Sequence, residues 1–389
     1  MIESYRAAFN AAFTPARYAA FQQLLVERCG VQIPFRCSET PCFFEAATLD
    51  AMVTAGRELI AQLVDNPSYL AQAAQAIPEA FRVPGTDPAP LFVQADFGLD
   101  ADFQPKLVEI QGFPSLYAFQ PALAEAYRDA FGLDSALSGF LEPTSRQSYD
   151  AVLSTALCNG HDPREVFLLE IAPQTQKTLP DFTLTEQRYG VRILDVQTVT
   201  KRGKQLFAPD GTPIKRLYNR VIVDEVVRKG IALPFDFRDE LDVEWAGHPN
   251  WYFLLSKFSL PFLDHPSVPK TQFLSDVTAL PENLDDYVLK PLFSFAGLGV
   301  KVGPIKADIE AVADPSEWIL QERVNFIPTI KTPEGPTKVE VRIMFVRVAG
   351  YYTAVTALLR LGRGKMLGVD HNRDATWIGA SAAFTVPGA

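Results

Sequence analysis

The chain has 389 residues, 48% of them hydrophobic and 21% charged, with a formal net charge of −10. This length suffices for two or three domains, and the acidic balance argues against nucleic acids and anionic membranes as main partners. No hydrophobic run approaches the roughly 20 residues that span a bilayer, no signal-like segment opens the chain, and the four cysteines lack paired spacing, so we expect a protein of the reducing cytoplasm.

Residues 1–88 are predicted to be mostly helical, because hydrophobic residues recur at three- and four-residue spacing over 16–28 and 46–74. Cys37 and Cys42 have the residue type of a metal-binding pair, but no histidine or second cysteine pair completes four ligands. A structural role is therefore the better interpretation of this region.

The pattern then changes to strands. Residues 91–97 and 105–111 are predicted as neighbouring strands joined by a polar turn. Because side chains alternate across a strand, Glu109 and Gln111 share one face, and Asp96 on the first strand can reach it. Two carboxylates and an amide oxygen form a ligand set suited to Mg²⁺. The alternative is that these groups are only the solvent-exposed ends of a hairpin.

A small α/β unit is expected next. Its predicted elements are a helix (146–157), a strand (165–172), a helix (181–189), a strand (191–196), a hairpin turn (209–213) and a strand (214–224). The first strand is almost entirely apolar, so it is predicted to lie inside a sheet covered on both faces. On the last strand, Lys215, Arg216 and Arg220 are equally consistent with contacts to an anionic substrate and with exposure to solvent.

The most informative stretch lies in the last third of the chain. A buried strand ends in Lys290, and Gly297 and Gly299 lie in the loop that leads to a second strand at 300–302. Glycine reaches positive φ without steric cost, so the loop can fold its backbone N–H groups over an anion, to which Lys290 would add a charge. Taken alone, the loop is better explained as a glycine hairpin without a ligand, because such hairpins are common.

The remaining elements of this part are predicted from their periodicity and turn residues. They are a helix over 251–260 that carries Lys257, a turn at 266–271, a helix over 308–313, a strand over 318–324, a hairpin of 339–347 with 351–360, and a segment at 379–384 that closes the fold. In the hairpin, Glu340 and Arg342 face the same side.

In this order the segments resemble the ATP-grasp superfamily. That family has a lysine on a helix, a Val-Pro-Lys-Thr-like turn, a strand ending in Lys-Pro, a glycine loop, a Leu-Gln-Glu-like hinge, an acid-x-Arg strand and a later Arg…Asn…Gly. This chain supplies Lys257, 268–271, Lys290-Pro291, Gly297 and Gly299, 320–322, Glu340-Val-Arg342, Arg360, Asn372 and Gly379.

The segment that resembles the family's metal-binding strand lies early in the chain. Glutathione-synthetase-like members have Glu-x-Asn and a Pro-Ser turn after the Asn…Gly segment, whereas this chain has Glu109-Ile-Gln-Gly-Phe-Pro-Ser115. This order resembles the circularly permuted glutathionylspermidine synthases, over residues 90–385. Two departures are Gln111 for the asparagine and Gln94-Ala-Asp96 for Arg-x-Asp; Arg342 or Arg360 is a candidate to replace the missing cation.

The resemblance implies an α+β protein with an ATP-grasp fold, two α+β lobes in permuted order. Its parts would be a helical N-terminal region (1–88), a permuted segment with the metal-site strands (89–145), a small α/β pre-grasp domain (146–250) and the nucleotide-binding lobes (251–389).

It also implies an ADP-forming ligase that forms C–N bonds, joining a carboxylate to an amine, or to a thiol, through an acyl phosphate. The substrates would be small and amino-acid- or peptide-like. ATP would contact Lys257, Lys290, Gly297, Gly299, Gln321, Glu322 and Val324, and Mg²⁺ would be held by Asp96, Glu109 and Gln111. Arg342 and Arg360 are the candidates for stabilising the acyl phosphate and the tetrahedral intermediate.

Other interpretations stay open. A nucleotide-binding protein that has lost catalysis would account for Gln94 and Gln111, a phosphotransferase would use the same fold without an amine, and a purely structural protein is disfavoured by the ordered motifs. Among the histidines only His371, beside Asn372, is a candidate. We expect small-molecule carboxylate and amine partners, no nucleic acid and no membrane, and the prediction leaves room for a homodimer.

Overall fold

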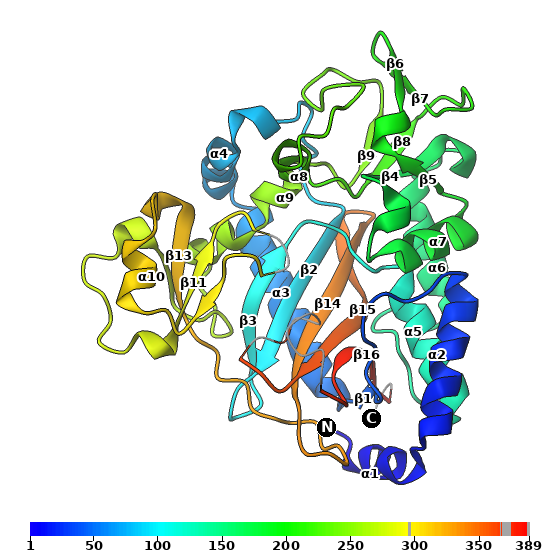
Figure 1. Ribbon diagram of the computed structural model, residues 1–389, viewed down its shortest axis with the longest axis vertical. Helices are drawn as coiled ribbons and strands as arrows, with labels where there is room; N and C mark the ends of the chain where they lie inside the picture. Colours follow the sequence, from blue (N-terminus) through cyan, green and yellow to red (C-terminus); the bar gives the residue numbers. More distant parts are fainter. Residues whose placement is uncertain (295–296, 366, 368–374, 387–389) are drawn as a thin grey trace.

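The computed structural model describes residues 1–294, 297–365, 367 and 375–386. At its centre lies a six-stranded sheet in the order β1-β16-β15-β14-β2-β3 (Figure 1). Its strands are β1 (Cys42–Phe43), β2 (Phe92–Leu99), β3 (Pro105–Gln111), β14 (Lys338–Val348), β15 (Tyr351–Gly362) and β16 (Gly379–Phe384). Because β2 pairs with β14, two strands from early in the chain complete a sheet whose centre comes from its end.

Both faces of this sheet are covered. Alternate side chains of β14 enter different hydrophobic cores, as the two-residue period of a strand requires. Ile343 and Phe345 pack in the core that includes α3 (Ala46–Val64), whereas Met344 lies in the core that includes α5 (Phe119–Phe131). Figure 1 shows α3 crossing behind the sheet, in agreement with its contacts to β14.

A second sheet is parallel throughout, in the order β5-β4-β8-β9. Its strands are β4 (Val166–Glu170), β5 (Arg192–Asp195), β8 (Arg216–Asn219) and β9 (Glu244–Ala246), and α6 (Arg146–Cys158) and α7 (Leu179–Tyr189) belong to the same unit. All five residues of β4 are buried, which confirms the prediction of an interior strand. The parallel order follows from the α7 crossover that joins β4 to β5.

A third sheet is antiparallel and lies beside β3 (Figure 1). It has the order β10-β13-β11-β12, with β10 (Thr271–Phe273), β11 (Tyr287–Pro291), β12 (Lys301–Val302) and β13 (Trp318–Glu322). The helix α10 (Lys306–Glu310) lies between β12 and β13 in the chain. The segment before β10 attaches to β3, because the Leu107 N–H donates to the Ser267 carbonyl at 2.7 Å. This contact brings the glycine-loop strands next to the strand that carries Glu109.

The remaining helices show ordinary start and stop signals. Thr14 caps α2 (Pro15–Cys29), whose first residue is proline and which ends at Gly30 in the left-handed conformation. Asn66 and Pro67 divide the helical pattern predicted over 46–74 into α3 and a separate α4. The others are α1 (Glu3–Ala12), α4 (Pro67–Ala76), α8 (Val223–Arg228) and α9 (Trp251–Leu254). Within the described residues no helix is long and apolar enough to cross a membrane.

Two local predictions are corrected. The helix expected over 251–260 ends at Leu254, and Ser256 caps a separate 3₁₀ helix (Lys257–Phe262) that contains Pro261. The strand expected over 214–224 is only β8, because the chain turns into α8 after it.

The sequence pattern missed a hairpin that lies ahead of the predicted turn. Its strands, β6 (Thr200–Arg202) and β7 (Gln205–Phe207), turn at Gly203. The predicted turn at 209–213 is confirmed: the Ala208 N–H donates to the Thr212 carbonyl, and Phe207 pairs with Pro213 in an antiparallel bridge.

Candidate functional site

A buried ion cluster lies where β2, β3 and β14 run side by side. Asp96 is paired with Glu109 on one side and with Arg342 on the other, and it is fully buried. Arg342 donates from Nε and Nη2 to the two carboxylate oxygens of Asp96, at 2.6 and 2.7 Å, and from Nη1 to Gln94 Oε1 at 2.9 Å. The solvent-exposed alternative is therefore wrong for Asp96.

Arg360 on β15 joins the same cluster from the next strand. Its Nε donates to Glu340 Oε1 at 2.7 Å, and its Nη2 contacts both Asp96 and Glu340. Burial on its own would raise the pKa of Asp96, but Arg342 and Arg360 outweigh it and lower that pKa. Burial raises the pKa of Glu340 despite the opposing charge of Arg360. Both arginines proposed to replace the missing cation thus contact Asp96.

Two buried lysines approach Glu109 from the other side of β3. Lys290 Nζ donates to the Val108 carbonyl at 2.9 Å and to Gln321 Oε1 at 2.6 Å. The β2–β3 register shifts at Val108, and this bulge leaves its carbonyl unpaired in the ladder and open to the lysine. Burial, opposed by Glu109 and reinforced by Lys257, lowers the pKa of Lys290 to about 8.

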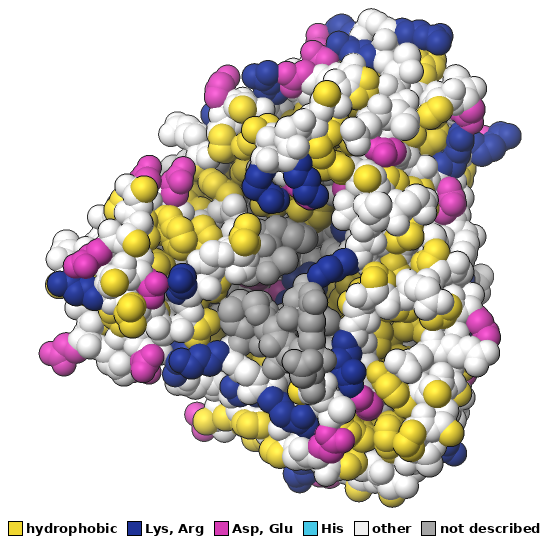
Figure 2. Space-filling view, in the orientation of Figure 1, with side chains coloured by type: hydrophobic (Ala, Val, Ile, Leu, Met, Phe, Trp, Pro, Cys, Tyr) yellow, Lys and Arg dark blue, Asp and Glu magenta, His cyan; other side chains and the backbone are white. Residues whose placement is uncertain are grey.

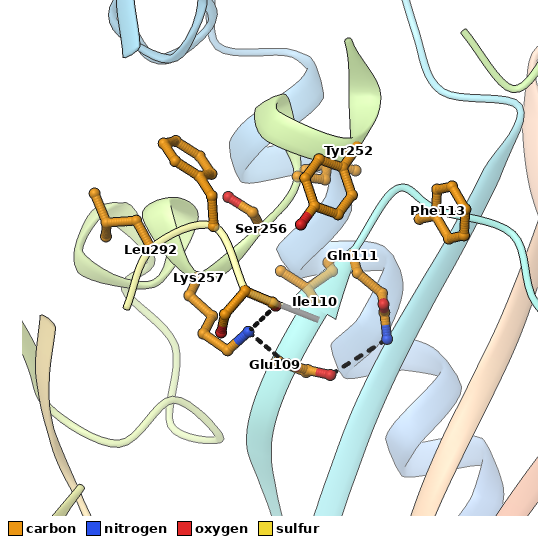
Figure 3. A pocket seen from close by; sticks show the side chains of 11 residues that line it. Glu109, Ile110, Gln111, Phe113, Tyr252, Ser256, Lys257 and Leu292 are labelled. Atoms are coloured by element: carbon orange, nitrogen blue, oxygen red, sulfur yellow. Dashed lines mark hydrogen bonds and ion pairs between the residues drawn. The ribbon is translucent and has the colours of Figure 1, made fainter. Parts of the chain in front are cut away.

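Lys257 occupies the first position of the 3₁₀ helix after α9. Its Nζ donates to the Ser294 carbonyl at 2.8 Å and lies 3.4 Å from Glu109 Oε2. Figure 3 shows Lys257 reaching toward Glu109, with Gln111 on its far side; Gln111 Nε2 donates to Glu109 Oε1 at 3.3 Å. Glu109 therefore links the lysines to the arginine cluster, because Arg342 Nη2 is also 3.8 Å from it.

A small cavity of about 30 Å³ opens among these groups, with the polar ends of Glu109, Gln111 and Lys257 on its wall (Figure 3). This is room for about one water molecule, so a larger ligand requires Lys257 and its neighbours to separate. Ser294 Oγ also lies at this wall and is buried without a hydrogen-bond partner among the described residues. It was not recognised from the sequence, where nothing distinguishes it from other loop serines.

The glycine loop and the strand after it lie as expected in outline. Gly297 and Gly299 have φ values of 75° and 77°, which favour glycine. Gln321 does not face solvent: its side chain is buried, accepts from Lys290 and donates to Thr271 Oγ1 at 3.0 Å. Glu322 is exposed and Val324 half-buried. His371 and Asn372 lie outside the described residues.

The charge around this region differs from that of the whole chain. On the face shown in Figure 2, Lys and Arg side chains surround the middle of the molecule, whereas most Asp and Glu side chains lie nearer its rim. The net charge of −10 therefore hides a basic area. Such an area favours a small anionic ligand.

The comparisons with known proteins concern the fold. No protein-family model and no curated protein match the chain. Among solved structures it resembles a glutathione synthetase-like effector from Globodera pallida in its apo form, with a TM-score of 0.60, 11% identity and alignment over 95% of this chain and 96% of that one. The fold is glutathione synthetase-like. At this identity the likeness shows the fold alone, and the ATP-grasp assignment and the permuted order stay predictions.

Within the glutathione synthetase-like fold, the parallel sheet carries a second polar group at the carboxyl ends of its strands, where open α/β sheets bind ligands. Arg220 directly follows β8 and is 4% exposed, yet its Nε and Nη1 have no hydrogen-bond partner among the described residues. Its guanidinium lies 5.0 Å from the ring centre of Phe113, which also lines the cavity at Lys257.

The other two basic residues of that segment behave differently. Arg216 is buried and donates to the carbonyls of Leu157 and Ala156 and to Glu244, so it is a structural residue. Lys215 is exposed. Sequence reasoning missed Glu170, the last residue of β4, whose burial raises its pKa to about 7 against the charge of Arg220. Its position at the end of an apolar parallel strand was the available signal.

The predicted magnesium ligands do not all fit a metal. Both oxygens of Asp96 already accept from guanidinium groups, and only Glu109 and Gln111 are partly exposed. Among the described residues there is no group of three His, Cys, Asp or Glu side chains placed to hold an ion. The cysteines do not change this, because all four are buried and free, and burial raises the pKa of Cys42 to about 12.

Proposed function

We propose that the chain binds ATP between the antiparallel sheet β10-β13-β11-β12 and the six-stranded sheet. It would use the ATP to activate a carboxylate for ligation to an amine or a thiol. The proposal combines the glutathione synthetase-like fold with the ordered motifs that resemble ATP-grasp enzymes. The adenine would lie against Gln321, Glu322 and Val324, and the phosphates would lie under Lys257, Lys290 and the loop from Gly297 to Gly299. A homodimer and a cytoplasmic location are further parts of the proposal.

The observation that carries it is the pair of buried lysines. Lys257 and Lys290 are 7% and 6% exposed and come from different elements; Lys257 pairs with Glu109, and Lys290 lies close enough to feel the charges of both Glu109 and Lys257. A buried charge is costly unless it is paired. With Arg342 and Arg360 included, four cations face three carboxylates, those of Asp96, Glu109 and Glu340, which leaves a positive excess. A polyphosphate is the ligand that such an excess would neutralise.

The proposed reaction is the one that the resemblance to ATP-grasp ligases implies. One oxygen of the substrate carboxylate would attack the γ-phosphorus, the bond to the bridging oxygen of ADP would break, and an acyl phosphate would form. The amine would then attack the carbonyl carbon, lose a proton and expel phosphate. Lys257 and Lys290 would hold the phosphates, and Arg360, whose side chain is 20% exposed against 9% for Arg342, is the more accessible stabiliser of the intermediates.

Arg220 supports an amino-acid- or peptide-like acid as the substrate. A guanidinium with two unpartnered nitrogens is a suitable binding group for a carboxylate. Glu170, close enough to Arg220 to feel its charge, would suit the ammonium group of the same molecule. The reacting carboxylate would then lie beyond Phe113, on the side of Lys257.

A second candidate is a nucleotide-binding protein without turnover. It is favoured by the engagement of Asp96 with two arginines and by Gln111, whose amide donates to Glu109. Such a protein would bind ATP and leave it intact.

The decisive experiment is calorimetry with ATP, with and without Mg²⁺, on the wild type, Lys257→Ala and Lys290→Ala. We expect binding to weaken by about tenfold or more in each variant, since each loses a charge-assisted contact. Lys306→Ala is the matched control. Lys306 is 74% exposed and pairs with Glu310 on α10, the helix between β12 and β13. If the wild type does not bind ATP under either condition, both candidates are wrong.

Turnover separates the two candidates. With ATP bound, ADP and phosphate release is measured over pairs of amino-acid-like acids and amines. The ligase predicts release that requires both partners and a KM for the acid that rises in Arg220→Ala. The absence of release with every pair, alongside tight ATP binding, favours the non-catalytic protein.

A further inference from the structure

We propose that Arg342 is the fixed cation of this site, standing between the two carboxylates that the sequence assigned to magnesium, so that a polyphosphate binds here without a divalent ion on Asp96. The inference rests on the proposed nucleotide site and adds how that site balances its charge. One of the two sequence departures, Gln94, then becomes part of this arrangement, because it accepts a hydrogen bond from Arg342.

The position of the guanidinium is the first argument. Asp96 and Glu109 are direct partners across β2 and β3. Arg342 reaches from β14 so that its Nη2 is 2.7 Å from Asp96 Oδ2 and 3.8 Å from Glu109 Oε1. A cation that bridges these two carboxylates would stand at this place. Mg²⁺ needs oxygen ligands at about 2.0–2.1 Å in near-ideal geometry, and Arg342 prevents Asp96 from offering one.

The support of the guanidinium is the second argument. Gln94 is fully buried, accepts from Arg342 Nη1 at 2.9 Å and donates from Nε2 to the Ser115 carbonyl at 2.8 Å. An arginine at position 94 has no acceptor atom and would repel Arg342. Gln94 therefore fits beside Arg342, whereas the arginine of the family's Arg-x-Asp pattern would not. In this chain the cation beside Asp96 comes from β14, and position 94 supplies its hydrogen-bond acceptor.

The chemical consequence concerns metal dependence. A guanidinium is always protonated in proteins and cannot be removed by a chelator. Arg342 acts through Asp96 and Glu109 by cancelling their repulsion toward phosphate oxygens, so it is a positioning residue. Glu109 and Gln111 remain partly exposed, and a metal that arrives with the nucleotide would meet only these two side chains.

The test compares the affinity for ATP in excess EDTA and in millimolar Mg²⁺, by calorimetry on the full chain. For the wild type we expect the two affinities to agree within about threefold, and for Arg342→Ala we expect binding in EDTA to fall by about tenfold or more and to recover in Mg²⁺. Arg342→Lys, which keeps the charge, is expected to retain more binding in EDTA than Arg342→Ala. Melting curves of both variants show whether they fold.

A second readout does not involve the nucleotide. Titration with Mn²⁺ monitored by electron paramagnetic resonance is expected to show no bound ion at this site in the wild type and one in Arg342→Ala, where Asp96 Oδ1 and Glu109 Oε1 lose the guanidinium while Arg360 still contacts Asp96 Oδ2.

The outcomes distinguish the two proposals. ATP binding to the wild type that requires Mg²⁺ overturns the role of Arg342 and leaves the nucleotide site intact. No ATP binding in either condition overturns the nucleotide site and this inference with it. Should both Arg342 variants fail to fold, the wild-type comparison in EDTA and in Mg²⁺ decides alone.

Discussion

Asp96 shows at the scale of one residue how the site is balanced. It is fully buried, and it stays ionised because two guanidinium groups outweigh the cost of burial. Each of those arginines also faces a second carboxylate, Arg342 toward Glu109 and Arg360 toward Glu340. Exchange of any one member of the cluster for a neutral residue would therefore leave its partner with fewer opposite charges to offset the cost of burial. The buried charges of the cluster are thus mutually dependent, and Arg360, whose side chain is 20% exposed, is the arginine more accessible to a ligand.

Lys290 is predicted to make nucleotide binding depend on pH. Its pKa is lowered to about 8, mainly by burial, so at pH 7 it is charged and above pH 9 it is mostly neutral. An anionic ligand prefers the charged form. We therefore expect the affinity for ATP to fall by about tenfold between pH 7 and pH 9.5, with proton uptake on binding near pH 8 to 9.

Calorimetry in buffers of different ionisation enthalpy measures both quantities. Lys290→Met is expected to bind ATP weakly and to lose the pH dependence over this range. A wild-type affinity that stays constant up to pH 9.5 would contradict the assignment of a shifted lysine to the phosphate site.

At the scale of elements, the site depends on a close approach between the end of β3 and α9. Gly112 donates its N–H to the Leu255 carbonyl at 3.1 Å, and a Cβ at this position would lie 2.7 Å from the Trp251 carbonyl oxygen. Gly112→Ala must push Gln111 and Phe113 away from the segment that carries Lys257. We expect it to lower the free energy of unfolding by about 1–3 kcal/mol and to weaken ATP binding by roughly fivefold.

The matched control is Gly139→Ala, where a Cβ would lie 3.1 Å from the Ala124 side chain, in the core between α5 and β16. It is expected to lower stability without a change in affinity. Urea denaturation and calorimetry on the two variants separate the effects, and equal affinities for both would show that the β3–α9 contact does not position the site.

The elements that the sequence predicts well are those with a strong local pattern. The strand 105–111 has the predicted limits, because a polar turn before it and a glycine after it bound it clearly. The helix over 251–260 was wrong because Pro261 and the Ser256 cap override its apolar spacing. β1 was missed, since two residues paired only to β16 leave no periodicity to detect.

The site residues also differ in how far a local sequence pattern predicts them. Asp96 and Glu109 were predicted to lie on facing strands, and they do, because alternation and a short turn fix that register. The bidentate bond from Arg342 to Asp96 required β14 to pair with β2, a contact between distant parts of the chain that no local pattern contains. The same holds for Ser294 and Glu170, which become candidates only through their burial and neighbours.

At the scale of the whole molecule, the N-terminal helices belong to the cores of the central sheet. Phe21 and Leu25 of α2 lie in the core shared with α5, and Leu59 and Leu63 of α3 lie in the core shared with β14 and α9. β1 joins the sheet edge next to β16. Residues 1–88 carry none of the predicted site residues, yet α3 covers the face of the sheet opposite to the one from which Arg342 and Asp96 project.

This arrangement predicts that a cavity in α3 loosens the site sheet more than the parallel sheet. Leu59 is fully buried in the core of β14 and α9, whereas Phe167 and Leu169 on β4 belong to another core. Leu59→Ala is expected to cost about 2–5 kcal/mol. Hydrogen exchange should show faster exchange for the amides of β14 and a smaller change in β4. Val227→Ala, at a side chain that is 62% exposed, is the control without effect. Equal losses in both sheets would mean that the cores open as one unit, and unchanged protection in β14 would mean that α3 does not support the site.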